Sequence, residues 1–279
     1  MANIFSLYGS IFIDNEKANK AIDGTTKKGE NFASKLGGVF SKVGKGALAL
    51  GGTLTTAATA IGGLAINTSK DVDQAMNSFI VQTGIAKNES GEWQKALEDI
   101  YKNNYGESFE DIANSMALAS QELYEFDPSQ IKAVTENALA LRDAFGVEVN
   151  ESIRATKALM TQFGISADEA YNLMAQGAQA GLDFSGELVD NINEYSVQFG
   201  KLGLSAEDMF NIFQSGADAG AWNLDKIGDA VKEFSIRAID GSKTTVEGFT
   251  KLGLNADTMA KKFAAGGDTA KEAFYQTID

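Results

Sequence analysis

Apolar side chains recur at spacings of three and four residues from Asp71 onward, which is typical of amphipathic helices. The two clearest apolar stripes contain Val72, Met76, Phe79 and Ile80, and then Trp93, Leu97, Ile100 and Tyr101. The chain has a single proline, which fits long helices with few forced turns. The pattern therefore predicts an all-α fold over residues 70–279, built as an array of amphipathic helices and helical hairpins.

A unit of 39 residues is repeated without a gap over residues 163–239. Eleven residues of the first copy occur again 39 positions later: Gly164, Ser166, Ala167, Asn172, Gly177, Ala178, Ala180, Gly181, Asp190, Glu194 and Ser196. Identities at one constant offset indicate a duplicated supersecondary unit. We expect Gly177, Gly181, Gly216 and Gly220 to split each copy into two helices, so that the copies form folded hairpins rather than one straight helix.

A large residue followed by glycine marks five positions along the chain. These are Tyr105-Gly106, Phe145-Gly146, Phe163-Gly164, Leu202-Gly203 and Leu252-Gly253. Glycine readily takes the left-handed conformation that ends many helices, and serine or asparagine caps the start of the next helix. The predicted repeat boundaries are therefore Gly164 with Ser166, Gly203 with Ser205, and Gly253 with Asn255.

The first 45 residues have a different pattern. Residues 4–13 alternate between apolar and polar side chains, which predicts a short N-terminal β-strand that either pairs with another chain or forms an extended arm. A lysine-rich helix is expected from Glu16 to Leu36. Residues 1–45 carry seven lysines against four acidic residues. This excess forms either a basic arm for an acidic partner or a solvated helix face.

Residues 46–69 form a separate Gly/Ala/Thr-rich segment of 24 residues without a charge. Its large apolar residues are Leu48, Leu50, Leu54, Ile61, Leu64 and Ile66. A helix of this length could cross the ~30 Å hydrocarbon core of a membrane. The alternative is a close-packed helix or helix pair that uses glycine for backbone approach. At the other end, the final helix stops at Asp279 without a cap, so we expect the helical core of residues 70–279 to be truncated.

The composition excludes several kinds of chemistry. The chain contains neither cysteine nor histidine, which rules out disulfides, thiolate or imidazole metal sites and histidine-based triads. The net charge is −14, and after residue 45 there are 17 basic residues (24 minus 7) and 34 acidic ones (38 minus 4). This balance argues against a specific nucleic-acid site. We predict no catalytic residue, no cofactor and no metal site.

The remaining candidates have structural explanations. The acidic pairs Asp168-Glu169 and Glu207-Asp208 stand at matching helix starts, where the helix dipole favours negative charge. Trp93 and Trp222 could be ligand platforms, but such residues more often pack a junction between helices. We therefore expect both tryptophans to serve packing.

Taken in order, these features resemble the N-terminal and core region of phage tail tape measure proteins. The resemblance is carried by the segment from Leu7 to Ile13 with the lysine-rich helix after it, the Gly/Ala/Thr-rich segment, Val72-Asp-Gln-Ala-Met-Asn77 with Thr83-Gly84, and the repeated helices that follow Phe-Gly or Leu-Gly. The segment from Ala219 to Phe234 is similar to versions from prophages of Gram-positive bacteria. Members are usually longer, with extended helices that act as the ruler, and this chain has no such helices.

The resemblance implies a structural protein that lies in several copies inside a tail tube. It would set the length of the tube by its own length and assist tail assembly and genome delivery. The implied partners are the tail tube protein, the tail assembly chaperones, the baseplate hub and further copies of the same chain. The implied locations are the virion, the host cytoplasm during assembly and the host membrane at infection.

The alternative hypothesis is that residues 46–69 insert into a membrane. Replacing Gly52 and Leu64 by lysine should then abolish leakage of liposomes, because a buried charge opposes insertion. Release of a trapped dye by the intact chain and by the double variant tests this. Equal leakage from both proteins would count against the hypothesis.

Overall fold

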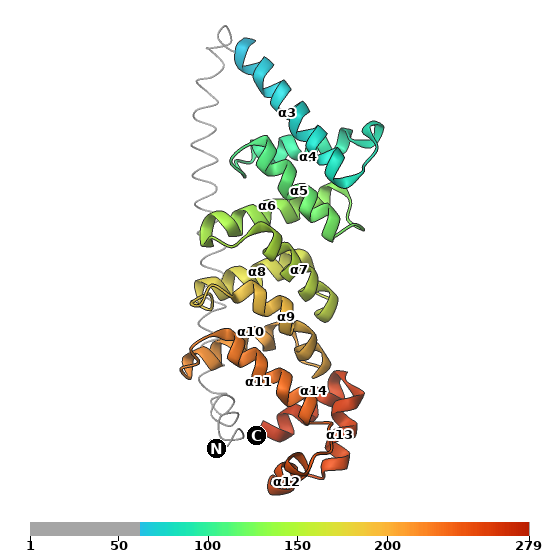
Figure 1. Cartoon of the computed structure of the whole chain (residues 1–279), viewed down its shortest axis with the longest axis vertical. Coiled ribbons are helices and arrows are strands. Elements are labelled where there is room, and N and C mark those ends of the chain that lie inside the picture. Colours follow the sequence, from blue (N-terminus) through green and yellow to red (C-terminus); the bar gives the residue numbers. More distant parts are fainter. Residues whose placement is uncertain (1–61, 279) are drawn as a thin grey trace. The chain divides into compact units, whose positions relative to one another are not determined.

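The computed structural model describes residues 62–278, with side chains from Lys70 onward. Twelve α-helices and one short 3-10 helix form this part of the chain, and it contains no strand (Figure 1). The predicted all-α fold is thus confirmed for these residues. The strand predicted at residues 4–13 and the lysine-rich helix predicted after it lie outside the described residues.

The described chain divides into two compact units between Arg154 and Ala155. The helices of the first unit are α3 (Gly62–Thr83), the 3-10 helix η1 (Lys87–Glu89), α4 (Gly91–Lys102), α5 (Phe109–Glu122), α6 (Pro128–Phe145) and the first residues of α7 (Val149–Phe163). In this unit α3 packs along α5, and α4, α5 and α6 pack against one another. Each helix therefore buries its apolar stripe against at least one other helix.

The core of the first unit contains the residues that the apolar spacing selects. Phe79, Leu97 and Ile100 are fully buried. The Trp93 ring lies 5.2 Å from the Phe79 ring, so this tryptophan joins α4 to α3, as expected. Tyr101, at the edge of its stripe, is exposed and stacks on Phe109 with a centroid separation of 4.1 Å.

The start and end of α6 follow local sequence signals. The Asp127 carboxylate accepts hydrogen bonds from the backbone N–H groups of Ser129 and Gln130, both at 2.9 Å. Pro128 occupies the first helical position, where its missing N–H costs nothing. Gly146 ends the helix with a φ of 73°, in the left-handed region.

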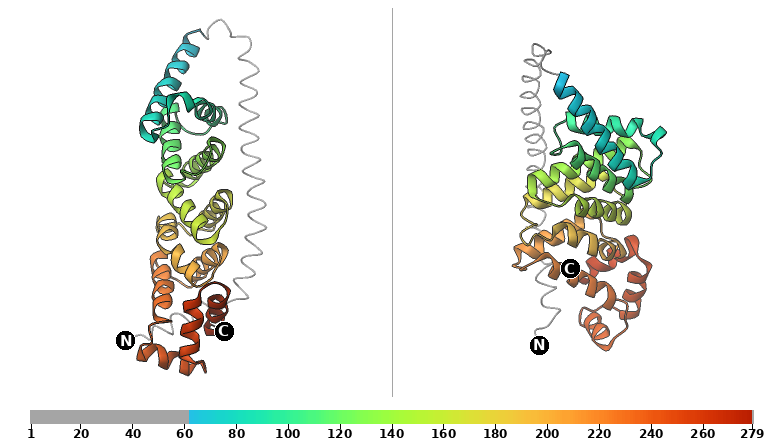
Figure 2. Two further views of the ribbon diagram at one scale, coloured as in Figure 1. Left: turned by 90° about the vertical axis from the view of Figure 1, so that its right-hand side faces the viewer. Right: turned by 45° about the horizontal axis from the view of Figure 1, so that its top comes forward.

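The second unit contains the rest of α7 and seven further helices. These are α8 (Ala167–Gln179), α9 (Leu188–Lys201), α10 (Ala206–Asp218), α11 (Leu224–Arg237), α12 (Lys243–Lys251), α13 (Ala256–Ala265) and α14 (Gly267–Ile278). Each 39-residue copy folds as a hairpin, α8 with α9 and α10 with α11. The copies stack like on like, α8 on α10 and α9 on α11, which produces two layers of helices (Figure 2).

Two of the four glycines expected to break the repeat units lie elsewhere. Gly181 and Gly220 stand between the helices with φ values of 83° and 93°, as a break requires. Gly177 and Gly216, however, lie inside α8 and α10, so the expectation that they split the units was wrong. A Cβ atom at Gly216 would approach the side chain of Ile227 to 2.6 Å, so the glycine is needed for close packing of α11 on α10.

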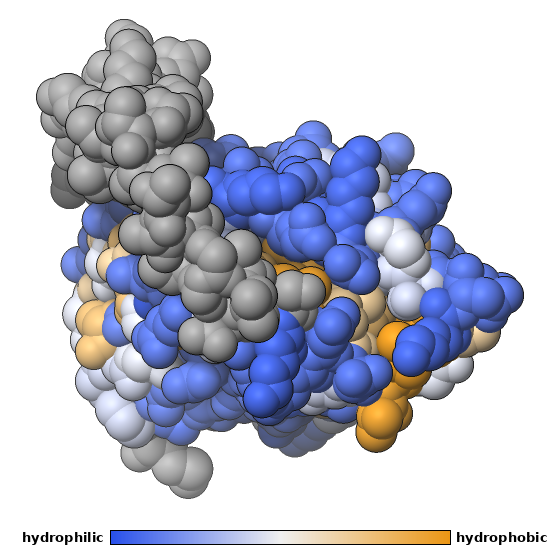
Figure 3. All heavy atoms as spheres, turned by 90° about the horizontal axis from the view of Figure 1, so that it is seen from above, coloured by the Kyte–Doolittle hydropathy of each residue, from blue (hydrophilic) through white to orange (hydrophobic). Residues whose placement is uncertain are grey.

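The amphipathic pattern also determines the surface. On the face drawn in Figure 3, hydrophilic side chains dominate and apolar side chains are confined to small areas. The acidic excess of the chain is consistent with such a solvated surface.

Replacing Gly228 by alanine should destabilise the second unit. The added Cβ would overlap the ring of Tyr195, a side chain that is only 1% exposed and cannot move away without disturbing the core. Overpacking of this kind costs about 1–3 kcal/mol, and thermal unfolding followed by circular dichroism measures it.

The matched control is Gly200→Ala in α9 of the same unit. The nearest atom to a Cβ at this position is the Gln162 carbonyl oxygen, at an ordinary 3.5 Å. This variant should be unchanged or stabilised by up to ~1 kcal/mol, because alanine favours helix. Equal destabilisation by both substitutions would contradict the packing argument.

Candidate functional site

The residues predicted to mark the repeat boundaries do so through backbone conformation. Gly164, Gly203 and Gly253 have φ values of 69°, 72° and 72°, which are strained for any residue with a side chain. At Gly203 a side chain would also collide with the carbonyl group of Gly267, at the start of α14. Gly203 is thus required both for its conformation and for the close approach of α14.

The residues two positions after these glycines cap the next helices. The side chains of Ser166, Ser205 and Asn255 accept hydrogen bonds from the backbone N–H groups of Glu169, Asp208 and Thr258, at 3.2, 3.1 and 2.9 Å. The first two caps are reciprocal, because the carboxylates of Glu169 and Asp208 accept from the backbone N–H groups of the capping serines. The acidic residues at the helix starts therefore have a structural role.

The predicted membrane or packing residues lie mostly beyond the described part of the chain. This applies to Leu48, Leu50, Leu54 and Ile61. Leu64 and Ile66 lie in the first turns of α3, whose later turns carry Lys70 and other charged residues. Among the described helices, none has the length and apolarity that crossing a membrane requires.

Asp208 differs from its counterpart Glu169, because it also holds a distant helix. Its Oδ2 atom accepts a hydrogen bond from Nζ of Lys271 in α14 at 2.7 Å. Burial raises the pKa of Asp208, but hydrogen bonds from Lys271 and from the Ser205 backbone lower it further, so the net pKa lies below the usual range. Sequence reasoning missed this ion pair, because 63 residues separate its members and no local pattern connects them.

A buried tyrosine joins α9 to α11. The hydroxyl group of Tyr195 lies 2.7 Å from Oδ1 of Asp225 and 3.0 Å from Oδ1 of Asp229. Nζ of Lys232 lies 5.6 Å from the centre of the ring. Burial, followed by the hydrogen bonds to the two carboxylates, raises the pKa of Tyr195, so the hydroxyl keeps its proton and donates it. One side chain thus connects the second helices of the two repeat copies.

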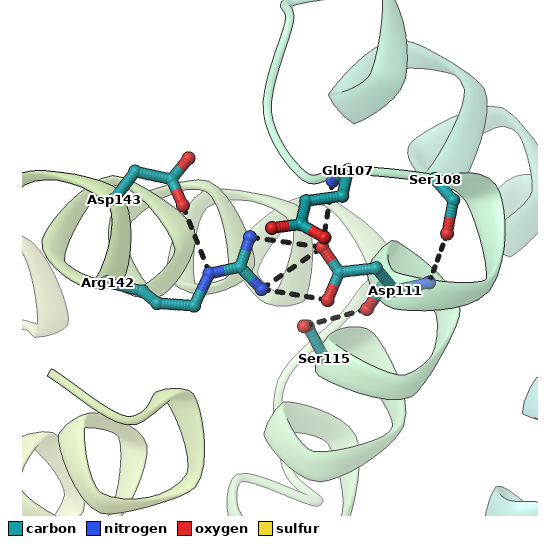
Figure 4. Close-up of polar contacts among 6 residues, drawn as sticks. All are labelled: Glu107, Ser108, Asp111, Ser115, Arg142 and Asp143. Carbon is teal, nitrogen blue, oxygen red and sulfur yellow. Dashed lines mark hydrogen bonds and ion pairs between the residues drawn. The ribbon is translucent and has the colours of Figure 1, made fainter. Parts of the chain in front are cut away.

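In the first unit, the corresponding polar contact joins α5 to α6 (Figure 4). Nη1 of Arg142 lies 2.8 Å from Oδ1 of Asp111, and Nη2 lies 3.1 Å from Oδ2, so the pair is bidentate. Asp111 also accepts a hydrogen bond from the backbone N–H of Glu107 at 2.9 Å. Nε of Arg142 binds Asp143 at 3.0 Å.

These contacts determine the electrostatics of Asp111. Burial raises its pKa, but the hydrogen bonds from Arg142 and from the Glu107 backbone lower it further, and the net pKa is below the ordinary value. The same hydrogen bonds raise the pKa of Arg142. The arrangement therefore fixes the crossing of two helices and keeps both groups charged.

The polar groups described above act as mechanical joints. Each binds a group on another helix, or caps its own helix, through hydrogen bonds or ion pairs. Within residues 62–278, no three metal-binding side chains lie close enough together to hold an ion. The structure thus points to the surfaces and joints of the repeats as the features that matter for function.

Replacing Asp111 by asparagine should lower the free energy of unfolding of the first unit by about 1–3 kcal/mol at neutral pH, because a charged hydrogen-bonded partner is lost. A folded-state pKa below the unfolded value of about 3.9 stabilises above that value, and the effect is lost as the pH falls through the folded pKa. The difference between variant and parent should therefore shrink in acid. Urea unfolding followed by circular dichroism and Trp93 fluorescence measures it at each pH.

The matched control is Asp143→Asn, which removes the other carboxylate on Arg142. Asp143 is 53% exposed and should cost less than about 1 kcal/mol. If Asp111→Asn were equally destabilising at every pH, altered packing rather than lost charge would be the cause.

Comparison with known proteins supplies the family. The family described as "Phage-related minor tail protein" matches residues 101–279, more than half of the chain. A relative from Streptomyces phage phiC31, described as "Probable tape measure protein", is 43% identical over 145 residues, which cover 52% of this chain and only 20% of the relative. No solved structure matches. The predicted resemblance to phage tail tape measure proteins is thereby confirmed, and this chain belongs to the phage-related minor tail protein family.

Proposed function

We propose that this chain is part of a tape measure that sets the length of a phage tail tube and assists tail assembly and genome delivery. The observation that carries the proposal is the 43% identity to the probable tape measure protein of phage phiC31. The chain covers a fifth of that relative, so the proposal concerns a part of a longer ruler. The helical hairpins of both units are consistent with a structural role.

Within this proposal the chain lies in the interior of the tail tube, in several copies, after assembly in the host cytoplasm. Its partners are the tail tube protein, the tail assembly chaperones and the baseplate hub. Residues 1–45 and 46–69 form separate N-terminal regions ahead of the helical core of residues 70–279. The role is non-enzymatic, and the use of Asp111, Arg142, Asp208 and Tyr195 as joints between helices supports it.

The folded hairpins set how much length each repeat contributes. As one continuous helix, a 39-residue unit would span about 59 Å at 1.5 Å per residue. Folded into helices of 13 and 14 residues, it adds only one layer to a stack, about 10 Å at the usual spacing of packed helices. We infer that the hairpins remain folded in the tail, because opening them would expose Tyr195, Phe199 and Phe213 to water.

The alternative function, membrane insertion through residues 46–69, stays a prediction from the uncharged run. Residues 46–61 lie outside the described residues, and residues 62–69 begin α3. No observation in the described part of the chain favours it over the tail role.

Inserting three extra copies of residues 163–201 into the full-length gene should lengthen the tail by about 30 Å, at about 10 Å per folded layer. The same insertion would add about 180 Å if the units were extended helices. Mean tail length in electron micrographs separates the two values. Unchanged tails would remove these units from the ruler, and an increase near 180 Å would show that the hairpins open.

The control is an insertion of equal length in which Gly216 and Gly228 are replaced by alanine in each added copy. These substitutions place side chains against Ile227 and Tyr195 and prevent the close packing of the hairpin. If tail length follows the stacking of folded hairpins, this insertion should give a less uniform set of lengths than the intact one. Identical distributions would contradict the folded arrangement.

A further inference from the structure

Three loops between helices each expose one aromatic side chain. Tyr124 is 77% exposed between α5 and α6, Phe184 is 48% exposed between α8 and α9, and Trp222 is 72% exposed between α10 and α11. The expectation that Trp222 packs a helix junction was therefore wrong. Its loop carries the ring beyond the end of α10, where its recorded ring contact is with Lys226.

These aromatic residues occupy equivalent places in the pattern of helix boundaries. Each follows a left-handed glycine by 18, 20 or 19 residues: Tyr124 after Gly106, Phe184 after Gly164 and Trp222 after Gly203. In each case the intervening helix has a serine as its N-cap. A single exposed aromatic residue needs no explanation, but recurrence at an equivalent position in three helices indicates a shared role for the loops.

The surroundings of the two loops in the second unit indicate the chemistry of a partner. Asp183 and Glu187 flank Phe184, and Asp218 and Asp225 flank Trp222. The Trp222 ring already accepts a cation, since Nζ of Lys226 lies 5.7 Å from its centre. A partner that supplies apolar side chains together with lysines would match both the rings and the carboxylates.

One segment of the same sequence has this chemistry. Residues 31–45 contain three lysines and no acidic residue. The lysines alternate with large apolar residues, namely Phe32, Leu36, Val39, Phe40 and Val43. The remainder of the chain is strongly acidic, so this segment is the basic and apolar complement of the aromatic loops.

We propose that the loops carrying Phe184 and Trp222 bind residues 31–45 of a second copy of this chain. Each chain has one such segment and three aromatic loops, so its own segment cannot occupy all of them. A contact between the segment of one copy and the loops of another is heterologous and leaves further copies free to add. The proposal does not depend on the role in tail length.

Sedimentation of the whole chain over a range of concentrations tests the proposal. The loop variant carries Phe184→Ser and Trp222→Ser, and the segment variant carries Lys35→Glu, Lys42→Glu and Lys45→Glu. Each should weaken self-association at least ~10-fold, which corresponds to about 1.4 kcal/mol. Both loop residues are exposed, so circular dichroism should show unchanged unfolding.

Mixing the two variants distinguishes binding between copies from binding within one chain. The segment variant keeps intact loops and the loop variant keeps an intact segment, so the mixture should associate where each variant alone does not. Ile236→Ser, at another exposed apolar residue of the second unit, is the control and should associate like the parent.

Three results would overturn the proposal. One is a parent chain that stays monomeric at all concentrations. Another is a loop variant that associates as strongly as the parent. The third is a mixture of the two variants that remains dissociated, which would assign the contact to one chain or to a different surface.

Discussion

The close stacking of helices across the repeated hairpins is the constraint on which the second unit depends. Layers of helices approach closely only where one of them lacks a side chain. Gly177 receives the ring of Phe210, Gly216 receives Ile227, and Gly228 receives the ring of Tyr195. Because each of these contacts joins different helices, the glycines determine how closely successive layers pack.

Polar contacts then fix which helices meet and at what register. Asp111 with Arg142, Asp208 with Lys271, and Tyr195 with Asp225 and Asp229 each connect two different helices. Unlike apolar packing, a bidentate or buried hydrogen bond is satisfied in only one arrangement. Apolar burial thus supplies most of the stabilisation, while these few joints select one packing among several similar ones.

The two copies of the 39-residue unit have diverged in how they use the same position. Glu169 caps α8 and is exposed, whereas Asp208 caps α10 and also binds Lys271 of α14. The difference arises because the second copy is followed by the helices α12 to α14, which pack back onto the repeat at Gly203. A member of an array therefore keeps the local function of a residue and adds a function that its neighbour requires.

Local signals in the sequence determined where the helices begin and end. Spacings of three and four predicted the helices, and Asp127, Pro128 and Gly146 bounded α6, because caps and left-handed glycines act within a few residues. The constant offset of 39 residues likewise predicted the duplicated hairpin, and the Asp168-Glu169 and Glu207-Asp208 pairs were correctly assigned to helix starts. These features need no knowledge of what packs against them.

Only the tertiary structure decided which residues meet across the units. Gly177 and Gly216 resemble helix breaks in the sequence, but they lie inside helices because Phe210 and Ile227 fill the space beside them. Trp222 resembles a packing residue, but its loop leaves it exposed. The ion pair of Asp208 with Lys271 spans 63 residues, and a contact of that range depends on how the layers stack, which no local pattern of side chains encodes.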